Sequence, residues 1–392
     1  MTFIIKKLPL EFDKELGPCE IFEKNVIKFL DELSKLILNT KKYNKFNDLA
    51  TFAFWCRKKN INAISKNYQS SNLTIGRGWV LHICPSNVPM NFAYSLAFGL
   101  LSGNNNIVKV PSRNFFQVNH LLNAIKKLIK KKNFLLIKKK LIFIKYQRND
   151  QISSELSKIV NARLIWGGDE TVKLFKKFET KPRCIDLNFS NRVSGAIIDL
   201  KSLKNLNYKN LYNLIFKFYN DSYLMDQQGC SSPQVIFWLG KKDKNMIKIF
   251  WNILSDIVSK NYNFDYSLAV RKTELASDII LKEKNLKSIN FKDLKTVRYR
   301  MKKVKKFDKL ENSFGTFLEI DINSLKKIKT FINDRFQTLL YYGIKKEELL
   351  SLISKNNFKG IDRIVPFGRA FDMNHIWDGF DIISSLSRKI SE

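Results

Sequence analysis

Short apolar runs alternate with helical segments of ten or more residues, and this alternation constrains the fold of the 392-residue chain most strongly. The expected helices span 21–38, 47–59, 91–101, 114–131, 150–160 and a segment opened by Gly167 and Gly168. The expected strands lie within 71–89, which ends in a Pro/Asn turn, and at 107–110, 141–146, 163–166, 184–189 and 194–199. Such alternation predicts an α/β fold with parallel strands.

The pattern starts again after Lys201, so we expect a second α/β unit from about residue 195. Its predicted elements are helices at 208–220 and 245–260 and a strand at 234–239, and the basic stretch 292–309 is expected to hold a strand and a solvated loop. The sequence therefore predicts domains at 1–194 and 195–365, followed by a tail at 366–392 that packs back or forms an oligomer contact.

Net charge raises the question of nucleic-acid binding, because 69 Lys and Arg against 36 Asp and Glu give +33. Only 14 of the 69 basic residues are Arg, the residue that binds phosphate and guanine through two hydrogen bonds. The lysines are spread along the chain. We therefore expect a lysine-coated protein that binds no nucleic acid.

The five cysteines are widely spaced, with no CxxC pair and no cluster of the three histidines, so neither a disulfide framework nor a metal site is expected. The longest apolar stretch, 91–101, is about half the length that spans a bilayer. We expect a cytoplasmic protein with free thiols and no membrane span.

A proline-bracketed turn, Pro85-Ser86-Asn87-Val88-Pro89, follows a predicted strand. Open α/β sheets bind ligands at the carboxyl ends of their strands, and a fixed amide can donate to a developing oxyanion. An asparagine that bonds only to its own turn fits the same residues.

A second candidate is Cys230, which follows Gly229 in a small polar turn before the apolar run 234–238. That position can expose a thiol to a ligand, although most free cysteines are buried and inert. The other four thiols lie in apolar or basic runs and are expected to pack. A third candidate is the Gly167-Gly168 turn, where backbone can approach a phosphate or ribose, or simply begin a helix. The GxGxxG fingerprint is absent.

The order of these segments resembles that of the aldehyde dehydrogenase superfamily. The run ICPSNVPMNFAYSLAFGLLSGNNNIVKVPS resembles the family's PWNFP turn, helix and lysine stretch, and WGGDE, QQGC, SFGTF and PFGRA follow in the expected places. Within the superfamily, HICPSNVP, DQQGCSSPQ and DRIVPFGRAFDMNHIWDGFDIISSLSR resemble the acyl-CoA reductase subunits of luminescence-type fatty-acid reductases. The resemblance implies a Rossmann-like cofactor domain at 1–194 and a catalytic domain at 195–365.

The resemblance implies that Cys230 attacks an acyl thioester and holds the acyl group until hydride from a nicotinamide releases the aldehyde. The side-chain amide of Asn87 and the backbone N–H of Cys230 would meet the oxyanion. Lys109 would contact the adenosine ribose. Ser112 stands where many NAD-preferring members carry Glu, and Arg113 follows it, so NADPH is expected, unless Arg113 only borders a solvated helix start.

Gly167, Gly168 and Phe314 fall on the family's cofactor-binding segments. The implied substrate is an acyl-CoA or an acyl-carrier thioester, with an acyl-transferring partner protein as a further candidate and a homo-oligomer as the expected assembly. Two alternatives stay open: oxidation of an aldehyde to acyl-CoA or acid, and a non-catalytic basic binding protein.

Several positions depart from the family pattern. Asp186, one methylene shorter, stands in the run 185–190 where hydrolytic members carry the Glu that activates water, so poor hydrolysis of the acyl-enzyme is expected. Asn312 replaces the ribose-binding Glu, with Glu311 one residue early, and Val172 replaces the third glycine of the phosphate loop. The charged residues near the C-terminus are expected to form salt bridges or a subunit contact rather than to be catalytic. They are Asp362, Arg363, Arg369, Asp378 and Asp381.

Overall fold

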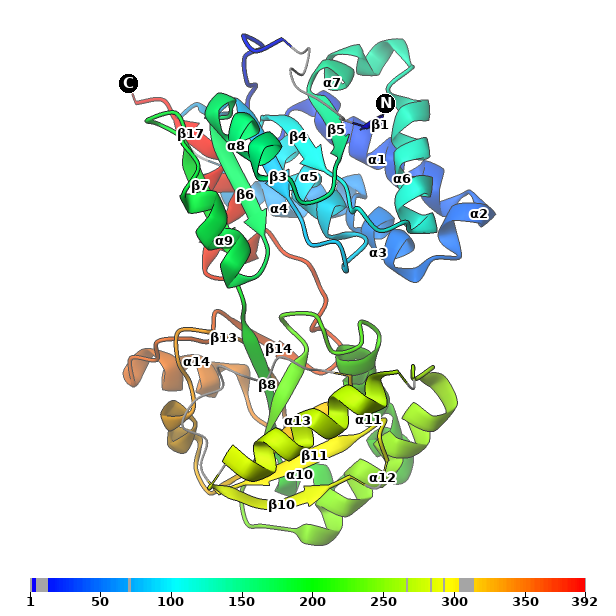
Figure 1. Cartoon of the computed structure of the whole chain (residues 1–392), viewed down its shortest axis with the longest axis vertical. Coiled ribbons are helices and arrows are strands. Elements are labelled where there is room, and N and C mark those ends of the chain that lie inside the picture. The colour runs from blue at the N-terminus through cyan, green and yellow to red at the C-terminus, as the bar shows by residue number, and fades with distance from the viewer. Residues whose placement is uncertain are drawn as a thin grey trace. The chain divides into compact units, whose positions relative to one another are not determined.

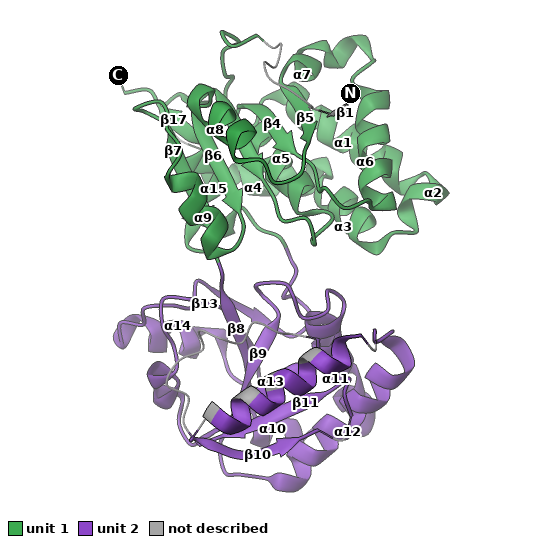
Figure 2. Ribbon diagram, viewed as in Figure 1, with its two compact units in different colours: residues 1–190, 373–392 green, residues 191–372 purple. Residues whose placement is uncertain are grey.

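The structure is a computed structural model, which describes residues 2–4, 13–69, 72–265, 267–282, 284–291, 293–302 and 314–391. The chain divides into two compact units, drawn in separate colours in Figure 2. The first unit contains Met1–Ser190 and Met373–Glu392, and the second contains Asn191–Asp372. Each unit is built around its own sheet.

These limits differ slightly from the domain boundaries expected from the sequence, 194/195 and 365/366, and contacts explain both differences. Val193 already pairs with Phe336 in the second sheet. After residue 365, the backbone N–H groups of Gly368 and Ala370 donate to the Asp221 carboxylate at 2.5 and 2.9 Å, which holds this segment in the second unit. The segment from Met373 then returns to the first unit.

The first unit has an N-terminal group of helices followed by alternating strands and helices. Its first elements are β1 (Thr2–Ile4), α1 (Lys24–Leu38), α2 (Lys41–Asn44), α3 (Asn47–Trp55), α4 (Lys58–Ser65), η1 (Lys66–Tyr68), β2 (Thr74–Gly76), β3 (Trp79–Ile83) and α5 (Asn91–Leu101). The next are β4 (Asn105–Lys109), α6 (Phe116–Leu128), η2 (Lys132–Phe134), α7 (Leu135–Lys139), β5 (Leu141–Lys145), α8 (Asp150–Ile159), β6 (Ala162–Trp166), α9 (Asp169–Lys176) and β7 (Ile185–Phe189). The C-terminal elements are β15 (Ile376–Trp377), β16 (Phe380–Asp381), α15 (Ile382–Ser385) and β17 (Ser387–Lys389).

The first sheet has six parallel strands in the order β1-β5-β4-β3-β6-β7. The central strand β3 is buried along its whole length, which explains its continuous apolar sequence. The chain passes from β3 to β4 on one side and returns to β6 on the other. Strand β3 is therefore the topological switch point, where doubly wound sheets bind ligands at the carboxyl ends of the strands.

Helix α5 packs closely on this sheet and carries the chain from the Asn87 turn back to β4. It is apolar all round and buried from Phe92 to Leu101, as expected of a helix with no solvent face. A Cβ at Gly99 would lie 2.0 Å from Asn106 Oδ1 and 2.9 Å from His82 Nε2, so only glycine allows this approach. His82 is fully buried between Ser95 and Asn106, and burial lowers its pKa to about 4.

Two expected elements are each divided in the structure. The helix expected at 47–59 ends at Trp55, and α4 starts at Lys58, because Asp31 of α1 accepts from the Lys58 N–H at 2.9 Å and supplies a cap from another helix. The strand expected within 71–89 breaks at Gly78, whose φ of +128° takes the chain from β2 to β3. Strand β2 pairs with β17, so the red C-terminal segment lies among elements of the first unit (Figure 1).

The second unit also alternates strands with helices. Its elements are β8 (Val193–Asp199), α10 (Leu200–Lys204), α11 (Tyr208–Tyr223), β9 (Pro233–Leu239), α12 (Lys244–Asn261), α13 (Leu268–Lys282), β10 (Leu286–Asn290), β11 (Val297–Met301), β12 (Thr316–Ile322), η3 (Leu325–Thr330), β13 (Phe336–Tyr342), α14 (Lys346–Lys355) and β14 (Arg363–Pro366). The strand expected in 292–309 is β11, and the loop expected after it falls mostly outside the described residues.

The second sheet has seven strands in the order β10-β11-β12-β9-β8-β13-β14. Only the pair β10–β11 is antiparallel among these strands. The amino ends of β8, β9, β12, β13 and β14 therefore share one edge of the sheet. That edge holds the turn that contains Cys230.

Candidate active site

Two consecutive left-handed residues shape the turn between α11 and β9. Asp226 and Gln227 have φ angles of +53° and +57°. The buried Gln227 amide donates to the carbonyls of Pro233 at 2.8 Å and Thr316 at 3.0 Å, and its oxygen accepts from the Thr316 N–H at 2.9 Å. These three bonds hold a strained backbone in one conformation and tie the turn to β9 and β12.

Cys230 lies half-buried in this turn and is held at both its backbone and its side chain. Ser194 Oγ donates to the Cys230 carbonyl at 2.6 Å, and the Gln337 amide donates to the Cys230 sulfur at 3.3 Å. The preceding residue must be small, because a Cβ at Gly229 would lie 2.7 Å from the Phe371 ring. The thiol therefore has a defined place, partial access and a hydrogen-bond donor.

The Arg363 guanidinium brings a positive charge to the same cluster. It donates to the backbone carbonyls of Ala370 at 2.6 Å, Arg369 at 3.0 Å and Asp372 at 2.6 Å. Burial lowers the pKa of Arg363, while the negative charges of Asp372 and the Cys230 thiolate act to raise it. A thiolate at Cys230 thus has a cation within electrostatic range.

A buried carboxylate completes this side of the site. Burial raises the pKa of Asp221 to about 7, even though the N–H groups of Gly368 and Ala370 favour its charged form. Through these two hydrogen bonds, Asp221 holds the segment after β14 in place. The backbone carbonyls of the same segment accept from Arg363.

The segment expected to bind cofactor around Phe314 packs against the Cys230 turn. Phe314 is left-handed, with φ of +41°, and its N–H donates to the Asp226 carbonyl at 2.8 Å. Gly315 has φ of +73°, and a Cβ there would lie 2.0 Å from the Lys295 carbonyl. The neighbouring positions Glu311 and Asn312, named above, lie outside the described residues.

Three of the other four thiols differ from Cys230 in their surroundings. Cys56 is fully buried, and burial raises the pKa values of Cys56 and Cys184. Burial also raises the pKa of Cys84 to about 12, although Ser95 and Lys109 act against it. These environments suit packing rather than nucleophilic chemistry.

The remaining predicted site residues lie in the first unit, at the carboxyl edge of its sheet. Asn87 is exposed in the turn after β3. Lys109 ends β4, and its Nζ lies 4.1 Å from the centroid of the Tyr146 ring, where burial lowers its pKa. The structure thus places an amide and a half-buried cation on the adjacent central strands of a switch point.

Ser112 and Arg113 are both exposed between β4 and α6. The Arg113 guanidinium carbon lies 5.5 Å from the Phe115 ring centroid. Helix α6 begins at Phe116 with Phe115 as its N-cap. The two side chains are thus available beside Lys109, at the carboxyl end of β4.

Gly167 and Gly168 lie where β6 leads into α9. A Cβ at Gly167 would lie 3.0 Å from Thr171, and Gly168 is the N-cap of α9. The first turn of this helix carries Asp169 and Glu170, whose charges favour the helix but repel a phosphate. The cations among the predicted cofactor residues are Lys109 and Arg113, at the carboxyl end of β4.

Asp186, which the resemblance places where hydrolytic members carry a water-activating Glu, is paired in the structure. Arg163 donates from Nε to Asp186 Oδ1 at 2.7 Å and from Nη2 to Asp186 Oδ2 at 2.5 Å. The side chain of Arg163 is only 3% exposed. A carboxylate held by both oxygens is a poor general base.

The C-terminal charged residues form the expected pairs only in part. Asp362 pairs with Arg192 at 3.4 Å, and Arg369 pairs with Asp372. Arg363 instead donates to three carbonyls beside Cys230. Gln337 and Arg363 were both missed as site residues; the one signal for Gln337 was a polar side chain inside the strand-like run FQTLLYY.

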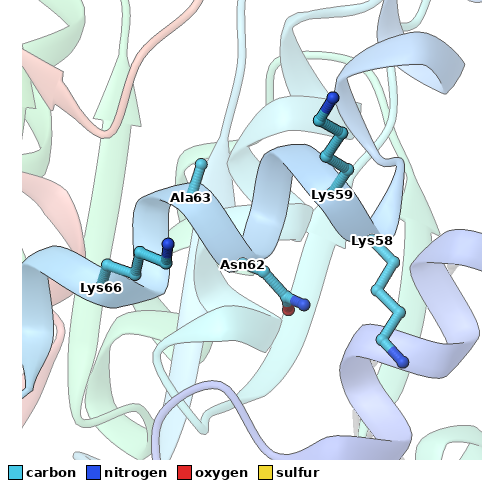
Figure 3. A pocket seen from close by; sticks show the side chains of 5 residues that line it. All are labelled: Lys58, Lys59, Asn62, Ala63 and Lys66. Carbon is cyan, nitrogen blue, oxygen red and sulfur yellow. The ribbon is translucent and has the colours of Figure 1, made fainter.

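A surface hollow on α4 and the start of η1 is no part of this arrangement. Its lining residues are Lys58, Lys59, Asn62, Ala63 and Lys66. Figure 3 shows that Lys58 and Lys59 point in opposite directions from a single helix. Within the part of the chain that the structure describes, no group of three His, Cys, Asp or Glu residues could hold a metal ion. No helix among the described residues is long and apolar enough to cross a membrane.

Solved structures share this architecture. Salicylaldehyde dehydrogenase from Pseudomonas putida G7 is 13% identical, with a TM-score of 0.64 over 96% of this chain and 86% of that chain. An indole-3-acetaldehyde dehydrogenase solved with NAD+ is 9% identical, with a TM-score of 0.63 over 94% of this chain and 82% of that chain. The chain has the aldehyde dehydrogenase fold, as predicted.

The family model of acyl-CoA reductase (LuxC) matches residues 24–389, so the chain belongs to this family of oxidoreductases. The long-chain acyl-protein thioester reductase of Aliivibrio fischeri is 23% identical over 313 residues. That match covers 77% of this chain and 60% of the relative. The family predicted from the sequence motifs is thereby confirmed.

Proposed function

We propose that the chain reduces a long-chain acyl thioester to the aldehyde through a covalent thioester on Cys230. The observation that carries the proposal is the built environment of this thiol. A strained turn presents it half-buried, and an amide donor and a guanidinium lie in the same cluster. Family membership supports the reaction class.

In the first step, the Cys230 thiolate attacks the thioester carbonyl carbon. A new C–S bond forms, the bond to the carrier sulfur breaks, and the carrier leaves as a thiol once it takes a proton. A bound reduced nicotinamide would supply hydride to the same carbon. Cys230 is then the leaving group: its C–S bond breaks, the electron pair returns to sulfur, and the aldehyde departs.

We propose NADPH as the reductant, with Lys109, Ser112 and Arg113 as the residues that favour it. Arg113 and Lys109 are cations suited to a phosphate, and Ser112 adds no negative charge to oppose it. Gly167, Gly168 and Phe314 remain proposed as backbone contacts for the dinucleotide. Asn87 is proposed as the amide donor to the oxyanion.

The pairing of Asp186 with Arg163 favours reduction over hydrolysis of the acyl-enzyme. A thioester that water attacks slowly persists until hydride arrives. Oxidation of an aldehyde to acyl-CoA uses the same thioester in reverse. The acyl donor is proposed to be acyl-CoA or an acyl-protein. The Aliivibrio fischeri relative is described as an acyl-protein thioester reductase.

Mass spectrometry of the full chain mixed with acyl-CoAs of several lengths, without nicotinamide, tests the proposal. The expected result is an acyl adduct on the Cys230 peptide, lost in Cys230→Ala and kept in Cys184→Ala. Addition of NADPH should remove the adduct and release aldehyde. An adduct on a different cysteine, or none with any donor, contradicts the proposed function.

A further inference from the structure

The Gln337 side chain is fixed so that its amide N–H points at the Cys230 sulfur. Gln337 is 1% exposed on β13. Thr338 Oγ1 donates to Gln337 Oε1 at 3.2 Å, which leaves the Nε2 group directed at the sulfur at 3.3 Å. The orientation of the amide thus follows from a neighbouring hydroxyl.

The same hydrogen-bond chain reaches the Cys230 backbone. Ser194 Oγ accepts from the Thr338 N–H at 3.1 Å and donates to the Cys230 carbonyl at 2.6 Å. Strands β8 and β13 therefore hold Cys230 at two points, through residues that are all buried.

An irregular strand register supports this arrangement. Phe336 pairs with Val193, but the next pair is Leu339 with Gly195, so β13 has one more residue than β8 between them. The register of β8 against β9 also shifts between Ser194 and Gly195. Such bulges redirect side chains and are frequent beside active sites. Here the bulge contains Gln337 itself.

An amide N–H stabilises a thiolate much more than a thiol or a thioester, because the hydrogen bond to an anion is charge-assisted. The sulfur carries this charge twice in the proposed reaction: when it attacks and when it leaves. The charged groups around the cluster are Arg363 on β14, Asp221 on α11, and Arg369 and Asp372 in the segment after β14.

We propose that Gln337 is a positioning residue that aims the Cys230 sulfur and stabilises it as a thiolate, with Thr338 fixing the direction of the amide. The inference rests on the proposed function, because only a covalent mechanism needs this thiolate. The inference assigns to Gln337 one role, which is to favour the ionised form of the Cys230 thiol.

The test measures alkylation of Cys230 by iodoacetamide against pH in the full chain, with the Cys230 peptide quantified by mass spectrometry. Loss of one hydrogen bond to a charged group in Gln337→Leu should move the half-maximal alkylation rate to higher pH by about 1. Gln337→Glu, which keeps the shape but adds a negative charge, should move it further. Thr338→Val should move it less, in the same direction.

Gln117→Leu is the matched control, since its amide donates to Asp48 at 3.1 Å in the first unit, and its profile should equal that of the wild type. Thermal unfolding establishes that each variant is folded; where Gln337→Leu is not, Thr338→Val decides, because it changes no charge beside the sulfur. Wild-type profiles in the folded Gln337 variants overturn the inference.

This measurement uses neither acyl donor nor nicotinamide, so it separates the two proposals. A shifted alkylation profile without an acyl adduct on Cys230 removes the proposed function and leaves the role of Gln337 in sulfur ionisation. An acyl adduct on Cys230 together with unshifted alkylation profiles supports the proposed function and removes the role of Gln337.

Discussion

The two units present their candidate residues on opposite edges of their sheets. In the first unit, Asn87, Lys109 and Gly168 follow the carboxyl ends of parallel strands. In the second, Cys230 and Gln337 lie at the amino ends. The first edge is made of loops, with Asn87 exposed and Lys109 and Gly168 half-buried, as general rules for ligand sites in α/β sheets expect. The second is a buried hydrogen-bond network, so the two sites should respond differently to substitution.

The largest expected effect is that of Cys230→Ala, which removes the only group proposed to form a covalent bond. Turnover, followed as NADPH oxidation with acyl-CoA, should fall by at least about 10³-fold. Cys184→Ala, another half-buried thiol, should keep wild-type turnover. Substantial activity in Cys230→Ala would show that the second unit does not supply the nucleophile.

The buried network should also be sensitive to pH through Asp221. Its pKa is raised to about 7 by burial, above the unfolded value, so the folded chain binds more protons and the free energy of unfolding falls as pH rises from about 4 to about 7. The decline should be at most about 4 kcal/mol. Chemical denaturation at several pH values should show a shallower decline in Asp221→Asn. The exposed Asp256→Asn is the control, and equal slopes in all three proteins contradict the assignment.

At the exposed edge, Asn87→Ala should lower kcat by about 10²- to 10³-fold, as loss of one oxyanion donor does. Stability should change little, because the side chain is exposed. Ser86→Ala, in the same turn, is the control for kcat and should behave as wild type. A change in KM alone would assign Asn87 to binding instead.

The smallest expected effect is that of Arg113→Ala on cofactor preference. Loss of a charge-assisted contact to a 2′-phosphate should lower kcat/KM with NADPH by about 10-fold and leave NADH unaffected. Arg148→Ala, an exposed arginine after β5, provides the comparison. Equal losses with both nucleotides would exclude a role in selecting NADPH.

The same contrast explains what the sequence could predict. Helix 91–101 was predicted to the residue, because a wholly apolar run has one solution in a buried helix. The Asn87 and Gly168 turns carry local proline and glycine signals. The Cys230 turn was found from its small polar neighbours and its family motif.

Other features depend on contacts distant in sequence. Gln337 lies 107 positions from Cys230, and its amide reaches the sulfur from β13, where the register against β8 shifts. The break between α3 and α4 depends on Asp31 of another helix. Helix α13 has a charged, weakly patterned sequence and was not predicted. Apart from the polar Gln337 inside a strand-like run, none of these features has a local sequence signal.

The pairing of β17 with β2 has a consequence for how the chain matures. Residues 373–391 contribute strands to the first unit, whereas the second unit is encoded entirely before them. During synthesis, which proceeds from the N-terminus, the Cys230 unit can close while the earlier-made unit still lacks its last strand. The unit whose synthesis begins first is therefore the last to have all of its strands.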